Sequence, residues 1–310
     1  MSASGRVGVM LPRDLPTADV LPFARRAEEL GFDELWVVED LGFRGGVAQA
    51  GAVLAVTSRI TVGIGILPAG ARNAAFAAME LATLGQLFPG RVIAGLGHGM
   101  PGWMRSVGAW PASPLTLLEE YTTAALALLR GEPGPPAGRY VSVEGVVISE
   151  RPEVVPPVVL GVRGPKSLAL AGRVADGVLL AEPATPAYIA ESRHRAAGTP
   201  LVITYDAAFV DEDGQAARDS ARPGLEWVGE PDWAPHIAPL PFAGEFAELR
   251  GRCASRSEFA AAMPDEWVRE LALAGTPSEV RGKIAARLEA GATSVVLIGS
   301  DLARLASVLG

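Results

Sequence analysis

Short apolar runs alternate with helix-forming stretches along most of the chain. The runs Val7–Leu11 and Pro157–Gly161 are apolar at nearly every position, which is typical of parallel strands covered on both faces. The stretch Asp19–Leu30 instead places its apolar residues on one helical face before Gly31. The pattern therefore predicts strands and helices in regular alternation.

Eight strands are predicted, each followed by a helix. The predicted strands are Val7–Leu11, Glu34–Glu39, Ile60–Leu67, Arg91–Leu96, Pro157–Gly161, a strand that ends at Leu180, Leu201–Val210 and Ser294–Ile298. The predicted helices are Asp19–Leu30, Gly45–Thr57, Ala74–Leu87, Leu115–Leu129, one that begins at Gly164 and Pro165, Pro186–Ala197, a helix from a Thr276 to Glu279 capping box to Glu289, and Leu302–Leu309.

This alternation favours a closed (β/α)8 TIM barrel, with all of residues 1–310 in one domain, over an open doubly wound sheet. A doubly wound fold usually carries G-x-G-x-x-G directly before a helix, and Gly97–Gly102 matches that spacing. We expect a loop, Trp103–Pro114, to follow, and no acidic residue ends the next strand. The match is therefore interpreted as chance.

Two segments exceed what a minimal barrel needs. Residues 131–156 contain a proline-rich linker and a predicted hairpin, with Tyr140–Val143 and Val146–Ser149 on either side of its turn. Residues 211–275 are predicted to form a helical lid, because long insertions in compact enzymes are usually functional. An insertion that faces a dimer partner, or one without function, is the alternative.

Composition and charge narrow the classes of partner. A net charge of −8 without a basic tract argues against a nucleic-acid surface, and no apolar run reaches the roughly 18 residues of a membrane span. The single cysteine, Cys253, allows no internal disulfide, and the N-terminus leaves no room for a signal peptide. We expect a cytoplasmic protein with a small-molecule substrate.

Several reaction classes are excluded by the residues at the predicted strand ends. Neither lysine ends a strand, as a Schiff-base enzyme would require, and the three histidines are too scattered for a metal site. No Gly-x-Ser-x-Gly motif is present. The glycine-rich strand ends suit a cofactor that brings its own reactivity.

The start of the helix at Gly164 is a candidate phosphate site. Pro165 suits the first helical position, and the N–H groups of Lys166 and Ser167 lack intrahelical partners. The helix dipole and the Lys166 ammonium add positive potential, which favours an anion such as phosphate. The alternative is a well-capped helix with a solvated lysine.

An ordered set of motifs between Val7 and about Ile298 carries a family resemblance. The motifs are Ala27–Trp36, Glu39-Asp40, Ala55–Gly63, Gly90-Arg91, Gly161–Ser167, Ala175–Gly177 and Gly275–Pro277. With these motifs the chain resembles the luciferase-like flavin- and deazaflavin-dependent oxidoreductases, in particular the F-420-dependent branch around methylenetetrahydromethanopterin reductase. The resemblance implies a bacterial luciferase-like (β/α)8 barrel and a homodimer.

The resemblance also implies a cofactor site. A non-proline cis peptide at Gly65–Ile66 would back the cofactor ring, the Gly164–Lys166 turn would hold the phosphate of its tail, and Asp40 would approach the deazaflavin. The expected cofactor-binding residues are Asp40, Gly65, Ile66, Gly97, His98, Gly161, Arg163, Gly164, Pro165, Lys166 and Ser167.

Two positions depart from the family pattern. Leu41 stands where many relatives carry a histidine, and Met100 stands where the sugar-phosphate dehydrogenases carry a glutamate. His98 is the one histidine that follows a predicted strand, so we expect it, with Asp40, to be catalytic. A structural histidine bonded to loop backbone is the alternative. For Arg72, we expect either a contact with the cofactor tail or a solvated side chain at the barrel rim. For Glu39, we expect either a hydrogen bond that supports a site residue or a buried, hydrogen-bonded acid without a role in the site.

The predicted function is hydride transfer between coenzyme F-420 and an organic substrate. The first alternative is an FMN-dependent monooxygenase of the same fold. The second is a cofactor-binding protein without turnover, because the family acid and base are absent at Leu41 and Met100. The sequence identifies neither the substrate nor the direction of hydride transfer.

Overall fold

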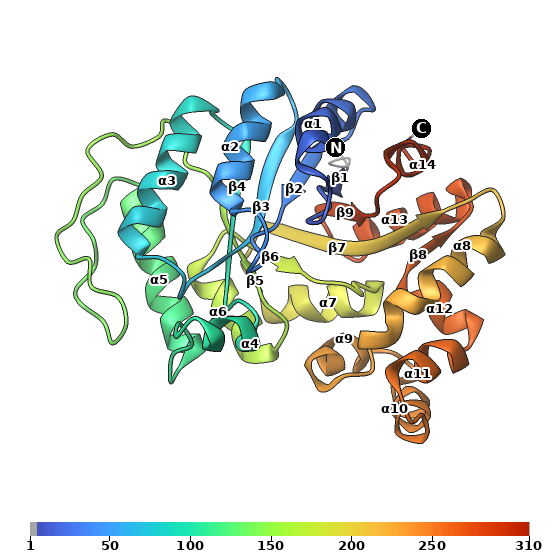
Figure 1. Cartoon of the computed structure of the whole chain (residues 1–310). Helices are drawn as coiled ribbons and strands as arrows, with labels where there is room; N and C mark the ends of the chain where they lie inside the picture. The colour runs from blue at the N-terminus through green and yellow to red at the C-terminus, as the bar shows by residue number, and fades with distance from the viewer. Residues whose placement is uncertain (1–4, 310) are drawn as a thin grey trace.

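The computed structural model describes residues 5–309, in which parallel strands close into a barrel surrounded by helices (Figure 1). The strands follow one another around the barrel in chain order, and β9 closes it by pairing with both β7 and β1. A short strand, β8, extends the sheet beyond β7. The strands are β1 (Arg6–Met10), β2 (Glu34–Val37), β3 (Thr61–Pro68), β4 (Val92–Gly97), β5 (Val158–Gly161), β6 (Gly177–Leu180), β7 (Leu201–Val210), β8 (Leu273–Gly275) and β9 (Ser294–Ile298).

Helices cover the outside of the barrel and form most of the long insertion. The helices outside the insertion are α1 (Val20–Glu29), α2 (Gly46–Val56), α3 (Ala74–Leu87), α4 (Pro101–Ser106), α5 (Pro114–Leu129), α6 (Pro165–Val174), α7 (Pro186–Arg195), α13 (Pro277–Glu289) and α14 (Leu302–Ala306), with the 3-10 turn η1 (Thr17–Asp19). Those within it are α8 (Gly214–Ala221), η2 (Arg222–Trp227), η3 (Pro231–Trp233), α9 (Ala234–Ile237), α10 (Ala243–Arg252), α11 (Arg256–Ala262) and α12 (Asp265–Leu271).

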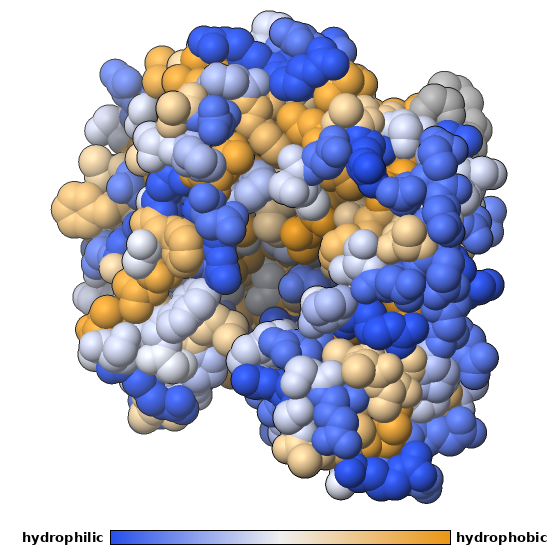
Figure 2. Space-filling model, turned by 45° about the vertical axis from the view of Figure 1, so that its right-hand side comes forward, coloured by the Kyte–Doolittle hydropathy of each residue, from blue (hydrophilic) through white to orange (hydrophobic). Residues whose placement is uncertain are grey.

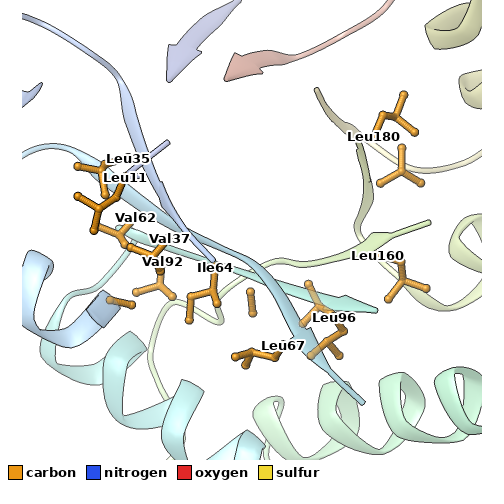
Figure 3. Close-up of a cluster of buried hydrophobic side chains, with 14 of the residues drawn as sticks. Leu11, Leu35, Val37, Val62, Ile64, Leu67, Val92, Leu96, Leu160 and Leu180 are labelled. Atoms are coloured by element: carbon orange, nitrogen blue, oxygen red, sulfur yellow. The ribbon is translucent and has the colours of Figure 1, made fainter. Parts of the chain in front are cut away.

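Both faces of the barrel strands are apolar because each face is buried. Leu35 and Val37 of β2 belong to the cluster between strands and helices, together with Leu160 of β5 (Figure 3). Trp36, between Leu35 and Val37, and Val159, next to Leu160, belong to the cluster inside the barrel. This period-two division explains the nearly continuous apolar runs.

The closed barrel agrees with the predicted fold, and the doubly wound alternative is wrong. Strands β7 and β9 and helix α3 have the predicted bounds, and other predicted elements differ at their ends by a few residues. Thr276 and Glu279 form the predicted capping box at the start of α13. The expected loop at Trp103–Pro114 is wrong in its first part, because helix α4 covers Pro101–Ser106.

The predicted hairpin in residues 131–156 is wrong, because that segment contains no strand. A turn does form at Glu144 and Gly145, but the backbone N–H groups of Arg139, Tyr140 and Val141 donate to the Glu120 carboxylate of α5 at 2.7–3.0 Å. Those N–H groups are therefore unavailable to a partner strand. The segment runs outside α3 and α5 as an irregular loop (Figure 1).

The insertion between β7 and α13 has a hydrophobic cluster of its own. Phe246, Phe259 and Trp267 lie in this cluster, with the Phe246 and Phe259 rings edge to face at 5.0 Å. The insertion is therefore a packed helical unit rather than an extended loop. Its helices agree with the helical secondary structure that was predicted for residues 211–275. None of the helices in residues 5–309 combines the length and hydropathy that a membrane span requires.

Candidate active site

A cavity of 470 Å³ lies at the carboxyl ends of the barrel strands, where enzymes of this architecture carry their active sites. Helix α4 forms one side of it, and Asp232 of the insertion reaches its wall. The face of the molecule in Figure 2 is hollowed, with hydrophobic residues gathered inside the hollow. Of the residues predicted for the cofactor site, those in the wall are Asp40, Gly65, Ile66, His98, Gly161, Arg163, Gly164 and Ser167.

Strand β3 enters the cavity wall through an irregular segment. Its register against β4 shifts between Ile64 and Leu67, and the peptide bond Gly65–Ile66 is cis, as predicted. The Tyr205 hydroxyl donates a 3.4 Å hydrogen bond to the Gly65 carbonyl oxygen. A Cβ at position 65 would overlap that hydroxyl, so the backbone approach requires glycine.

The side chain of Ile66 lies over two glycines of the neighbouring strands. A Cβ on Gly97 would lie 3.0 Å from Ile66 Cγ1, and one on Gly161 would lie 2.6 Å from Ile66 Cγ2. These glycines therefore leave room for the isoleucine rather than for a ligand directly. Gly97 is buried beneath Ile66 and is not part of the cavity wall.

Helix α6 begins at the cavity with an open position. Its first intrahelical hydrogen bond runs from the Leu168 N–H to the Gly164 carbonyl at 2.9 Å, so the preceding N–H groups of Lys166 and Ser167 have no such partner. A Cβ on Gly164 would meet no atom within 4 Å, and its φ of −83° suits any residue. Glycine here keeps the space in front of the helix empty. Lys166 and Pro165 are exposed and lie outside the cavity wall.

His98 lies in the cavity wall, half-buried, with its Nε2 atom 3.3 Å from the Ser167 hydroxyl oxygen. Burial lowers the pKa of His98 below its usual value of 6.5. The imidazole is therefore neutral at neutral pH, with one ring nitrogen able to accept a proton. Its side-chain partner is a hydroxyl from the start of α6, so the histidine and the candidate phosphate position are adjacent.

The two acids after β2 have different partners. Asp40 accepts from the Arg13 guanidinium at 2.6 Å and stands at the rim of the cavity. Glu39 accepts from Arg72 at 2.8 Å and from the Gly46 N–H at 2.8 Å, which holds the start of α2. Glu39 is thus held by hydrogen bonds while it lines the cavity, and Arg72 pairs with it rather than standing free in solvent.

Three residues in or next to the cavity were not among the predicted catalytic or cofactor-binding residues, although the place of Glu182 just after a predicted strand made it a candidate for the mouth of the barrel. Tyr205 lies inside strand β7, where no sequence signal separates it from core residues. Glu182 follows β6, and burial raises the pKa of its carboxyl group. Trp233 of the insertion donates its indole N–H to the Glu182 carbonyl at 3.1 Å, and its ring lies 4.5 Å from the Arg163 guanidinium. The insertion is therefore bonded directly to the cavity rim.

The geometry fits a flat cofactor with an anionic tail better than a metal. Residues 5–309 contain no group of three or more His, Cys, Asp or Glu side chains placed to hold a metal ion. The wall at Gly65 and Ile66 presents backbone and one aliphatic side chain, which suits a ring. The empty space at Gly164 leads to unpaired N–H groups, which suit a phosphate.

Comparisons with known proteins give a consistent set of relatives. A family model described as luciferase-like monooxygenase matches residues 1–294. A 5,10-methylenetetrahydromethanopterin reductase from Methanolobus tindarius is 27% identical over 92% of this chain and 91% of its own. An F-420-dependent glucose-6-phosphate dehydrogenase from Microbacterium testaceum is 35% identical over 52% of each chain. The structure of coenzyme F-420 dependent tetrahydromethanopterin reductase from Methanopyrus kandleri superposes with a TM-score of 0.82 at 22% identity, covering 99% of this chain and 97% of that one.

Proposed function

The chain belongs to the luciferase-like monooxygenase family, and from this premise we propose that it is an oxidoreductase which transfers a hydride between coenzyme F-420 and a small organic substrate. The observation that carries the proposal is that the Gly65–Ile66 segment and the open start of α6 line the same cavity. The names of the relative from M. testaceum and of the M. kandleri structure both specify F-420, which supports this cofactor.

In this proposal, Gly65 and Ile66 support the cofactor ring, and the N–H groups of Lys166 and Ser167 bind the phosphate of its tail. Arg163 adds positive charge from the same loop. F-420 supplies, when bound, the carbon centre that gives or accepts the hydride. The protein contributes geometry, because it holds the reacting partners next to one another in one cavity.

The proton that accompanies the hydride is assigned to His98. Its pKa is lowered by burial, so its neutral ring can accept a proton at Nε2 or return one to the substrate. The Ser167 hydroxyl, 3.3 Å away, orients that atom. Asp40, at the rim, is proposed to approach the deazaflavin while Arg13 fixes its carboxylate. The insertion of residues 211–275 is proposed to act as the lid, since Asp232 reaches the cavity.

An FMN-dependent monooxygenase is the second candidate. The family description names monooxygenases, and the start of α6 would suit the FMN phosphate equally well. A cofactor-binding protein without turnover is the third, since Leu41 and Met100 line the cavity at the two positions where relatives carry a histidine or a glutamate. We also propose that the protein is a cytoplasmic homodimer, with the dimer inferred from the family resemblance. Light scattering would test the dimer.

Titration of the purified apo-protein with each cofactor tests the proposal. We expect micromolar binding of F-420, followed by absorbance, and then oxidation or reduction of the bound cofactor by candidate organic substrates. Micromolar binding of FMN with no binding of F-420 would overturn the proposal in favour of the monooxygenase. Tight F-420 binding without turnover of any member of a broad acceptor panel would favour the third candidate.

A further inference from the structure

One wall of the cavity consists of apolar side chains that face solvent. Leu41, Met100 and Val107 are 49%, 38% and 55% exposed, although all three line the cavity. Trp103 and Trp110 continue the same wall. Large apolar side chains that gather in an open cavity, rather than scattering singly over a surface, mark a place where an apolar partner is bound.

The charged side chains that line the cavity are Glu39, Asp40, Arg163 and Asp232. Glu39 and Asp40 are neutralised by Arg72 and Arg13, with which they form ion pairs at 2.8 and 2.6 Å. Arg163 lies over the ring of Trp233, on the side of the cavity where α6 begins. Among residues 5–309, Arg163 is thus the one Arg or Lys that lines the cavity, and the apolar wall itself offers no cation that would pair with a substrate phosphate or carboxylate.

Arg105 is the one charged residue of α4. Its guanidinium rests on the Trp110 ring at 5.2 Å from the ring centre, and it is not part of the cavity wall. An anionic substrate placed against Leu41, Met100 and Trp103 would lose its hydration without gaining an ion pair, which is costly. An uncharged hydrocarbon surface would gain from the same contact.

We propose that this wall, formed by Leu41, Met100, Trp103, Val107 and Trp110, binds the apolar body of an uncharged organic substrate. The inference rests on the proposed function, since it assigns the remainder of the cavity to the cofactor. It predicts that phosphorylated sugars, such as the compound in the name of the M. testaceum relative, are poor substrates of this chain. The cavity of 470 Å³ must also hold the cofactor ring, so the substrate is small.

A matched pair of probes tests the inference on the apo-protein. The neutral probe is 2-naphthaldehyde, and the charged probe is 6-formyl-2-naphthoate, which adds a carboxylate to the same rings. Equilibrium dialysis measures both affinities. We expect the neutral probe to bind at least about ten-fold more tightly, the factor that a difference of about 1.4 kcal/mol gives. Equal or tighter binding of the carboxylate would overturn the inference.

Exposed residues of the same type away from the cavity provide matched controls. Met100→Glu should weaken binding of 2-naphthaldehyde at least about ten-fold, whereas Met79→Glu, at a methionine 51% exposed on α3, should not. Circular dichroism checks that each variant is folded. If a methionine variant does not fold, Leu41→Glu in the cavity wall and Leu87→Glu as its control form a second pair. Equal effects within both pairs would refute the assignment of the wall.

Titration of the same proteins with F-420 separates the two proposals. Loss of probe selectivity with F-420 binding retained would refute the apolar substrate and leave the proposed function intact. Retained selectivity without F-420 binding would refute the proposed function, because the wall would then serve a different reaction.

Discussion

Tyr205 and Gly65 meet inside the barrel although 140 residues separate them in sequence, with the tyrosine hydroxyl 3.4 Å from the glycine carbonyl oxygen. Trp36 packs edge to face on the Tyr205 ring, with ring centres 5.7 Å apart. This stack supports the bulged segment of β3 from within the barrel. The cavity wall is therefore held by core packing on one side and is open to a ligand on the other.

The contact between these two residues predicts the effect of a single methyl group. Gly65→Ala would place a Cβ against the Tyr205 hydroxyl and 2.8 Å from Leu179 Cδ2, so we expect a loss of about 1–3 kcal/mol in the free energy of unfolding. Urea denaturation measures it. Gly164→Ala is the control, because its Cβ meets no atom within 4 Å, and its stability should change by less than about 0.5 kcal/mol. Equal stabilities would contradict the packing.

The open start of α6 predicts how cofactor affinity responds to substitution. Gly164→Leu should block the space before the Lys166 and Ser167 N–H groups and abolish detectable F-420 binding while the barrel stays folded. Lys166→Ala should weaken binding only several-fold, since an exposed charge at a helix start contributes about 1 kcal/mol. Fluorescence titration measures both. The reverse order of effects would show that the lysine, not the helix start, holds the anion.

His98 is expected to carry a proton during turnover. His98→Gln can keep a hydrogen bond to Ser167 but cannot titrate, so turnover should fall about 100-fold. Because burial lowers the pKa of His98, the acidic limb of the rate profile should lie below pH 6.5 and vanish in the variant. Steady-state rates between pH 5 and 9 test this. Unchanged rates and an unchanged profile would make His98 a structural residue.

Burial of His236 in the insertion is expected to make the stability of the protein fall at acid pH. It is fully buried, stacks on Tyr188 and is bonded through Nδ1 to the Pro183 carbonyl at 3.1 Å, and burial lowers its pKa to about 3. The unfolded chain therefore takes up this proton near pH 6.5 while the folded chain does not, so stability is lost as pH falls below 6.5.

Comparison with a variant isolates the contribution of this histidine from that of other acid-sensitive groups. His236→Phe keeps a ring against Tyr188 but cannot titrate. Between pH 7 and 5 the wild type should lose about 2 kcal/mol more unfolding free energy than the variant. Urea denaturation at both values provides the measurement. Parallel losses in the two proteins would mean that folding does not lower the pKa of His236.

Local patterns determined most of the secondary structure. Helix α3 and strands β7 and β9 could be predicted with their bounds, because helix propensity and continuous apolar runs are properties of short stretches. The capping box of α13 and the cis bond at Gly65–Ile66 also followed from residues that are neighbours in sequence, the second through a family resemblance. The closed barrel followed from the number and order of these elements.

Partners distant in sequence were decided only by the tertiary structure. The segment around Val141 has strand-forming residues, yet the Glu120 carboxylate takes its N–H groups, and no local pattern marks that competition. The Tyr205 contact with Gly65 and the Trp233 bond to Glu182 likewise arise because barrel closure and the insertion bring remote segments together. A hydrogen bond across 20 to 140 residues depends on how the chain packs, and short-range propensity carries no information about it.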